Sequence, residues 1–214
     1  PRSFKSALIP FLARIPERVG FSGEGRSILL TDARKRHPTR HGAEIMDKTV
    51  WRYLGLGASK AAYERYQFDV PQPELRIDEA NAEQVLAQLG LDGTVPAVAI
   101  CPGAEYGPAK QWPLEYHRAL AAKLVECGYQ VWVIGGPKDA EAGDSIAGGQ
   151  DGVFNLCGKT RLEDTVDLFS RCHSVVSHDS GLMHVAAAAG SDVVAIYGSS
   201  SPDFTPPLTD KAII

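Results

Sequence analysis

The chain has 214 residues, of which 44% are hydrophobic and 22% are charged, and its formal net charge is −4 at pH 7. These values are typical of globular proteins and exclude an intrinsically disordered or collagenous chain. The length suits one large domain or two small ones. Because the sequence has no apolar run of about 18 residues and no recognisable secretory signal, we expect a cytoplasmic protein.

The N-terminal part predicts one amphipathic helix followed by short elements. Apolar residues recur at helical spacing over residues 3–15, with Pro10 as a kink or break within the pattern. Extended segments are expected at 18–21 and 27–31, and a further helix is expected at 47–56. This part of the chain therefore mixes short helices with short strands.

Positive charge is concentrated in the same part. Residues 1–48 hold ten Lys and Arg against five acidic residues, whereas the rest of the chain holds 12 against 21. Two interpretations stay open. The basic side chains form solvated faces, or they meet an anionic acceptor or membrane surface, with Arg34, Lys35 and Arg36 as candidates for that contact. The overall negative charge argues against nucleic acid as a partner.

A proline-containing segment separates this part from the rest. Residues 68–78 read F-D-V-P-Q-P-E-L-R-I-D and show no helical periodicity. Such a segment is typical of an extended connector between domains. We therefore expect a boundary between residues 68 and 80, with one domain at 1–72 and the other at 73–214.

Beyond the connector, apolar strand patterns alternate with helical patterns. Strands rich in Val and Ile that alternate with helices are typical of a parallel sheet covered on both faces. The expected strands are 94–100, 130–134, 153–156, 174–177 and 192–197. The expected helices are 114–125, 139–146, one from Thr160 through Phe169, and 181–189. This half of the chain is predicted to be a Rossmann-like α/β domain.

Two of these helices carry more specific expectations. Helix 114–125 is expected to bury the face that contains His117. Thr160 and Glu163 have the spacing of a capping box, which would start the third helix at Thr160. The buried stripe of that helix is expected to contain Leu162, Val166 and Phe169.

The cysteines and histidines show no metal-binding pattern. The four cysteines lie among apolar residues without a C-x-x-C pair, and we expect buried free thiols rather than disulfides or zinc ligands. They are Cys101, Cys127, Cys157 and Cys172. The sequence also lacks a Walker loop and an H-E-x-x-H motif, so neither a metal nor a cofactor is expected.

Three strand-to-helix loops carry the candidate site residues, because ligands of parallel sheets bind at the carboxyl ends of the strands. The loop 101–113 is rich in Gly and Pro and contains Lys110. The tight turn after the second strand contains Gly136 and Lys138. The loop 177–184 reads S-H-D-S-G-L-M-H.

The third of these loops predicts an anion site. Backbone N–H groups of Ser180 and Gly181 would face a ligand at the positive end of the following helix, where glycine lets a phosphate approach closely. Asp179 either caps this helix or accepts hydroxyl groups of a sugar or ribose. His184 lies one helical turn beyond Ser180 and is a candidate for the same ligand. A nucleophile elbow G-x-S-x-G is excluded because position 178 is His.

Three strings occur in the order that is found in one protein family. They are P-G-A-E-Y-G-P-A-K-Q-W-P at 102–113, H-D-S-G-L-M-H-V-A-A-A at 178–188 and Y-G-S-S-S-P-D-F-T-P-P at 197–207. With them the chain resembles the bacterial ADP-heptose:lipopolysaccharide heptosyltransferases of glycosyltransferase family 9, and among these the type II enzymes. The clear resemblance covers residues 95–208.

The resemblance implies a GT-B fold. In that fold a Rossmann-like, parallel-sheet C-terminal domain holds the donor, and the first part of this chain would be the truncated end of a similar, acceptor-binding N-terminal domain. The implied activity is an inverting transfer of L-glycero-D-manno-heptose from ADP-heptose to the lipopolysaccharide inner core. It would take place at the cytoplasmic face of the inner membrane, through peripheral contact with that membrane.

The resemblance also assigns expected roles to the loop residues. Lys110 would neutralise the diphosphate of ADP-heptose and stabilise the departing ADP, and Asp179 would contact the heptose or its neighbouring phosphate. The N–H groups of Ser180 and Gly181 would donate to the phosphates. Three further donor contacts are expected from His184, Gly136 and Lys138, the last two near the adenosine.

The chain departs from the family pattern in one respect. The family's general-base aspartate lies in a glycine-rich loop near the N-terminus, and no residue of this chain matches it. We therefore expect the general base upstream of Pro1, and a noncatalytic fragment that binds a nucleotide sugar is one alternative. A sugar-nucleotide epimerase is another, and it would need acid–base carboxylates such as Glu105 and Asp179.

Overall fold

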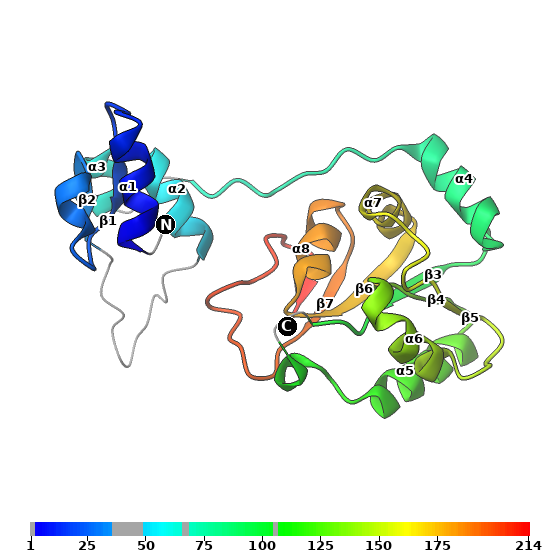
Figure 1. Cartoon of the computed structure of the whole chain (residues 1–214). Helices are drawn as coiled ribbons and strands as arrows, with labels where there is room; N and C mark the ends of the chain where they lie inside the picture. Colours follow the sequence, from blue (N-terminus) through cyan, green and yellow to red (C-terminus); the bar gives the residue numbers. More distant parts are fainter. Residues whose placement is uncertain (1–2, 36–48, 66–68, 105–106) are drawn as a thin grey trace. The chain divides into compact units, whose positions relative to one another are not determined.

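A computed structural model of the chain describes residues 3–35, 49–65, 69–104 and 107–214 (Figure 1). The chain divides into two compact units, residues 1–71 and 72–214. No helix within the described ranges is long and apolar enough to cross a membrane.

The first unit combines short helices with a small parallel sheet. Strand β1 (Val19–Phe21) pairs with β2 (Asp32–Arg34), and Val19 lies opposite Asp32. Helix α1 begins after Ser3, whose hydroxyl accepts the Ser6 N–H, and it continues through Pro10. The helices of this unit are α1 (Phe4–Leu12), the 3₁₀ helix η1 (Arg26–Leu29), α2 (Thr49–Gly57) and α3 (Lys60–Glu64).

The expected extended segment at 27–31 is wrong, because most of it belongs to η1. Gly25 turns the chain with a positive φ of 70°, which a residue without a Cβ adopts without strain. The buried Arg26 side chain then donates from Nε to the Phe21 carbonyl at 2.6 Å and fixes the turn. The strand follows η1 and is β2, which begins at Asp32.

Arg34 does not present its charge to a partner, contrary to the acceptor-contact interpretation. Its side chain is 3% exposed and donates to the Asp32 carboxylate at 2.7 Å and to the Gly55 carbonyl of α2. Arg34 therefore ties β2 to α2. Lys35 is exposed, and Arg36 lies outside the described residues.

The second unit contains a six-stranded parallel sheet in the order β5-β4-β3-β6-β7-β8. The strands are β3 (Ala97–Cys101), β4 (Gln130–Val133), β5 (Val153–Asn155), β6 (Cys172–His178), β7 (Val193–Ile196) and β8 (Ala212–Ile213). The strand order progresses one way from β3 to β5 and the other way from β6 to β8. The predicted Rossmann-like α/β fold is confirmed for this unit, and β8 pairs with β7 at the edge of the sheet.

Helices cover both faces of this sheet (Figure 1). Alternate side chains of β3 enter different cores: Ala97 and Ala99 pack with helices on one face, and Val98 and Ile100 pack with helices on the other. The first face carries α4 (Glu79–Leu89), α7 (Leu162–Ser170) and α8 (Gly181–Ala188). The second face carries α5 (Leu114–Glu126) and α6 (Ala140–Ala147).

Helix α4 was not predicted, because no element was expected between the connector at 68–78 and the strand at 94–100. The structure ends the connector at Asp78, whose carboxylate accepts the N–H groups of Ala80 and Asn81 and so caps the helix. Two short 3₁₀ turns also lie in this unit, η2 (Pro108–Lys110) and η3 (Pro137–Asp139).

Helix α7 begins one residue later than the expected capping box. Its N-cap is Arg161, whose N–H donates to the Asp164 carboxylate at 3.0 Å. Thr160 instead forms a hydroxyl contact of 3.1 Å with Thr165. The predicted pairing of Thr160 with Glu163 is therefore wrong by one position.

Two residues that were expected to be buried are exposed. Leu162 is 60% exposed at the first position of α7, whereas Val166 and Phe169, farther along the helix, are buried. Cys127 is exposed because it is the C-cap of α5 and lies at the end of that helix's outer surface. All four thiols are free, and Cys101 and Cys157 are buried as predicted.

The junction between α4 and α7 gives a stability prediction. Asp167 is 4% exposed and accepts the Asp78 N–H at 2.8 Å and the Asn81 side-chain amide at 2.7 Å. Asp167→Ala should lower the free energy of unfolding by about 2–3 kcal/mol in urea titrations, because both donors lose their acceptor. The exposed Glu163→Ala on the same helix should cost less than about 1 kcal/mol. Equal losses would contradict this role of Asp167.

Candidate functional site

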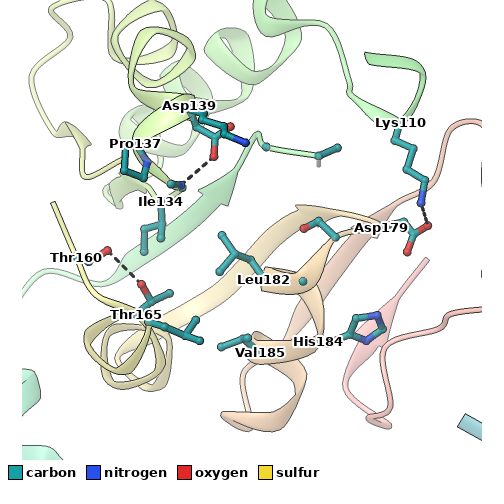
Figure 2. Close-up of a pocket in the computed structure, with 18 of the residues that line it drawn as sticks. Lys110, Ile134, Pro137, Asp139, Thr160, Thr165, Asp179, Leu182, His184 and Val185 are labelled. Carbon is teal, nitrogen blue, oxygen red and sulfur yellow. Dashed lines mark hydrogen bonds and ion pairs between the residues drawn. The ribbon is translucent and has the colours of Figure 1, made fainter. Parts of the chain in front are cut away.

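A cavity of about 1050 Å³ lies at the carboxyl ends of β3, β4 and β6. The loop after β3 and the N-terminus of α8 form one side of it, and the turn after β4 and the first turn of α7 form the other (Figure 2). The reversal of strand order between β3 and β6 opens this crevice, as it does in other doubly wound sheets. Its volume suits a ligand of the size of a nucleotide.

Lys110 and Asp179 meet inside this cavity (Figure 2). The Lys110 Nζ donates to Asp179 Oδ2 at 2.6 Å, and the Thr205 hydroxyl donates to Oδ1 at 3.0 Å. Burial raises the pKa of the Asp179 carboxyl, but the hydrogen bonds from Lys110 and Thr205 outweigh this effect and hold the pKa below its usual value. Asp179 is therefore ionised at neutral pH and acts only as an acceptor.

The sheet register explains why these two residues meet. Cys101, the last residue of β3, pairs with Ser177 near the end of β6, so both loops leave the sheet at the same level. The loop after β3 crosses to Asp179, which follows β6 directly. A separation of 69 residues in the sequence is thereby reduced to hydrogen-bond distance.

The N-terminus of α8 lies beside this ion pair. Ser180 is the N-cap, but its hydroxyl contacts that of Ser177 at 3.3 Å, and within the described residues no side chain caps the helix. Asp179 therefore does not cap it, because its carboxylate is engaged by Lys110 and Thr205. A Cβ added at Gly181 would meet no atom within 4 Å. The first turn of α8 thus offers backbone N–H donors and open space to an anion.

The opposite side of the cavity is a tight turn with an apolar wall. The Gly136 N–H donates to the Asp139 carboxylate at 2.9 Å, which closes the turn, and Lys138 is exposed on it. Figure 2 shows Ile134, Leu182 and Val185 on the wall between this turn and α8. The end with Lys110 and Asp179 is called the charged end below, and the opposite end combines this apolar wall with the side chains of Lys138, Asp139 and Arg161.

His184 adds a neutral polar group to the charged end. It is half-buried on α8, and burial lowers its pKa although the charge of Asp179 partly opposes the shift. At neutral pH its ring can both donate and accept. In the part of the chain that the structure describes, no three His, Cys, Asp or Glu side chains come together as metal ligands.

Comparison with known proteins places the chain in a family. The model of glycosyltransferase family 9 (heptosyltransferase) matches residues 1–214. The chain belongs to glycosyltransferase family 9. The predicted resemblance is thus confirmed.

Named relatives of this family 9 chain support its assignment to the family. It is 44% identical to lipopolysaccharide heptosyltransferase 2 of Salmonella typhimurium and 43% identical to that of Escherichia coli, over 99% of its own length and 62% of theirs. The solved structure of E. coli ADP-heptose lps heptosyltransferase II superposes with a TM-score of 0.83 at 42% identity, over 100% of this chain and 65% of that one. The chain therefore spans about three-fifths of the length of these relatives.

The structure brings together the donor-binding residues that the sequence singled out in this family 9 chain. The seven predicted donor-binding residues line this same cavity, although they come from three different loops. They are Lys110, Gly136, Lys138, Asp179, Ser180, Gly181 and His184. Their contacts with a ligand stay predictions. Glu105, named for the epimerase alternative, lies outside the described residues.

Several lining residues were missed. Thr205 belongs to the third family string, but its contact with Asp179 depends on the path of the loop after β7, which no local pattern reveals. Leu162 was assigned to the core, and its exposure in the cavity wall follows from the actual start of α7. The sequence feature that could have indicated the later start of α7 was Asp164, an acidic residue three positions after Arg161.

A buried histidine pair lies beneath the loop that carries Lys110. His117 of α5 and His178 of β6 are both fully buried, and their Nε2 atoms lie 3.2 Å apart. Burial lowers the pKa of His117 to about 4, with a further lowering by His178, and burial also lowers the pKa of His178. Both rings are therefore neutral in the folded chain at neutral pH.

This pair predicts sensitivity to acid. An unfolded chain takes up protons at these histidines near pH 6.5, whereas the folded chain resists until about pH 4, so stability is complete above pH 6.5 and is lost as the pH falls towards 4. We expect the free energy of unfolding to drop by about 2–3 kcal/mol over this window. In His117→Gln the drop should be clearly smaller, as measured by urea titrations at each pH. An identical drop would show that His117 does not contribute.

Proposed function

We propose that the cavity binds the ADP-heptose donor and that the chain is the donor-binding part of a heptosyltransferase that acts on the lipopolysaccharide inner core. The observation that carries this proposal is the Lys110–Asp179 pair beside the uncapped N-terminus of α8. A diphosphate needs cations and N–H donors, whereas sugar hydroxyls need hydrogen-bond acceptors. This end of the cavity holds both kinds of group, in Lys110 and Asp179. The names of the relatives supply the heptose and the lipopolysaccharide.

The phosphates are assigned to Lys110 and to the first turn of α8. The Lys110 ammonium brings a positive charge and N–H donors to this end of the cavity, where it also bonds Asp179, and phosphate oxygens are acceptors that suit it. The helix N-terminus adds backbone donors and a positive potential. When the bond between heptose and ADP breaks, negative charge grows on the phosphate, and these groups stabilise it more strongly than they stabilise the intact donor.

Asp179 is assigned to the heptose rather than to a phosphate. Its lowered pKa keeps the carboxyl ionised, and an ionised carboxylate repels phosphate but accepts hydrogen bonds from sugar hydroxyls. His184, one helical turn away, is neutral and suits the same ligand. The adenosine is then assigned to the other end, between the turn of Gly136 and Lys138 and the apolar wall.

The acceptor, its general base and the cellular location are proposed from the family relationship. Heptose would be transferred with inversion at the cytoplasmic face of the inner membrane, in peripheral contact with it. The general base would be supplied by the acceptor-binding domain, to which residues 1–72 are assigned. The exposed basic side chains of this part, such as Lys35, suit an anionic acceptor.

The epimerase alternative is not favoured. It needs a carboxylate basic enough to take a proton from a sugar carbon, but the hydrogen bonds from Lys110 and Thr205 lower the pKa of Asp179 and so make it a weak base. Family membership also points to glycosyl transfer.

Removal of the Lys110 charge gives the first test. Lys110→Met should weaken the binding of ADP and of ADP-heptose at least tenfold in calorimetry, because a charge-assisted contact contributes about 1.5–3 kcal/mol. Lys123→Met, at the exposed end of α5, is the matched control and should bind as the unchanged chain does. If the unchanged chain bound neither ligand, the proposed donor site would be wrong.

A larger side chain at the first residue of α8 gives the second test. In Gly181→Val the added Cβ meets no atom within 4 Å apart from its chain neighbours and the backbone of its own helix, so the melting temperature should stay within a few degrees while ADP binding is lost. Ser180→Ala keeps its backbone N–H and should change the ADP dissociation constant less than about threefold. Intact ADP binding by the valine variant would remove the helix N-terminus from the phosphate site.

A further inference from the structure

The described part of the loop that carries Lys110 is held to the end of β6 and to the loop after β7 by the following contacts. The Lys110 side chain reaches Asp179, the Ala109 carbonyl accepts the Ser199 N–H at 3.3 Å, and the Trp112 N–H donates to the His178 Nε2 at 2.9 Å. At Ser199 the backbones approach so closely that a Cβ on the preceding Gly198 would lie 2.9 Å from the Ala109 oxygen. Of these contacts, the one to His178 uses a buried side chain outside the cavity.

The hydrogen bond from Trp112 fixes the chemical state of His178. A peptide N–H can only donate, so the His178 Nε2 must carry a free electron pair, and the ring must be neutral. The lowered pKa of His178 agrees with this state, since burial disfavours its protonated form. His117 packs against the same nitrogen from below, and the Trp112 ring lies edge-on to the His117 ring at 5.1 Å.

A packing role alone does not account for a histidine at this position. His178 is fully buried at the end of β6, where an aliphatic residue would fill the space without placing polar nitrogens in the core. What an aliphatic residue lacks is the acceptor for the Trp112 N–H. The imidazole therefore holds a backbone atom two residues beyond Lys110, and its chain neighbour Asp179 holds the Lys110 side chain itself.

We propose that His178 is a positioning residue for donor binding: by accepting the Trp112 N–H it holds the loop so that the Lys110 ammonium faces the phosphate site before the ligand arrives. This inference rests on the proposed role of Lys110 in binding a diphosphate. When the loop is already ordered, ligand binding does not include the entropic cost of ordering it. Loss of the hydrogen bond that orders the loop should therefore weaken binding.

The test compares variants of the whole chain with ADP as the probe. His178→Leu removes the acceptor and should weaken ADP binding about tenfold, while His178→Gln restores an acceptor at similar reach and should recover most of the affinity. The exposed His173→Leu on the same strand is the matched control and should leave the affinity unchanged. Amide exchange at Trp112 should be faster in the leucine variant and slow in the glutamine variant.

A double variant separates positioning from general destabilisation. If His178 acts through Lys110, then His178→Leu should weaken ADP binding much less in a Lys110→Met background than in the unchanged chain. Equal loss in both backgrounds, or no loss in the single variant, overturns the inference. If the leucine variant does not fold, His178→Asn replaces it, because asparagine is one methylene shorter than glutamine. The asparagine variant should then bind ADP about tenfold more weakly than the glutamine variant, and equal binding overturns the inference.

The outcomes also distinguish this inference from the proposed function. Failure of the unchanged chain to bind ADP overturns both. Normal binding by the unchanged chain together with unchanged binding by His178→Leu overturns only the role of His178 and leaves the donor site in place.

Discussion

Parallel pairing of β3 with β6 is the constraint on which the rest of the second unit depends. The two strands are neighbours in the sheet, yet the chain leaves β3 towards β4 and leaves β6 towards β7, in opposite directions. Since neither crossover passes over the junction, the carboxyl ends of these strands face open space. The two loops that begin there supply Lys110 and Asp179, and the cavity follows from this arrangement.

Partly buried hydrogen bonds fix the positions of the loops that follow β3 and β6. His178 and Asp179 are successive residues, and their side chains serve different surroundings: one accepts a backbone N–H in the core, and the other accepts an ammonium in the cavity. Thr205 adds a hydroxyl to Asp179 from the loop after β7, and the Tyr197 hydroxyl in turn donates to the Thr205 carbonyl at 2.8 Å. The charged end of the cavity is thus supported by polar groups from several loops.

Much of this could be predicted from the sequence, and the failures have identifiable causes. The alternation of apolar strands and amphipathic helices fixed the parallel sheet, and the rule that ligands bind at carboxyl ends led to Lys110, Ser180 and Gly181. The start of α7 was placed wrongly because Thr160 fits the capping-box pattern, whereas the actual N-cap, Arg161, has no capping side chain and is held by the Asp164 carboxylate. Thr205 and the pairing of His178 with Trp112 depend on where long loops cross, and local sequence patterns contain no information about that.

The pairing of Lys110 with Asp179 also bears on which small molecules the cavity retains. In the described structure the ammonium and the carboxylate neutralise one another at 2.6 Å, so this end of the cavity holds balanced charges rather than an excess of positive charge. A simple anion such as inorganic phosphate must compete with Asp179 for the lysine and brings nothing that the carboxylate can accept. A molecule that joins a phosphate to a hydroxyl-rich sugar satisfies both partners at once. In the proposed donor site, this ion pair would therefore favour sugar phosphates over the abundant free anions of the cell.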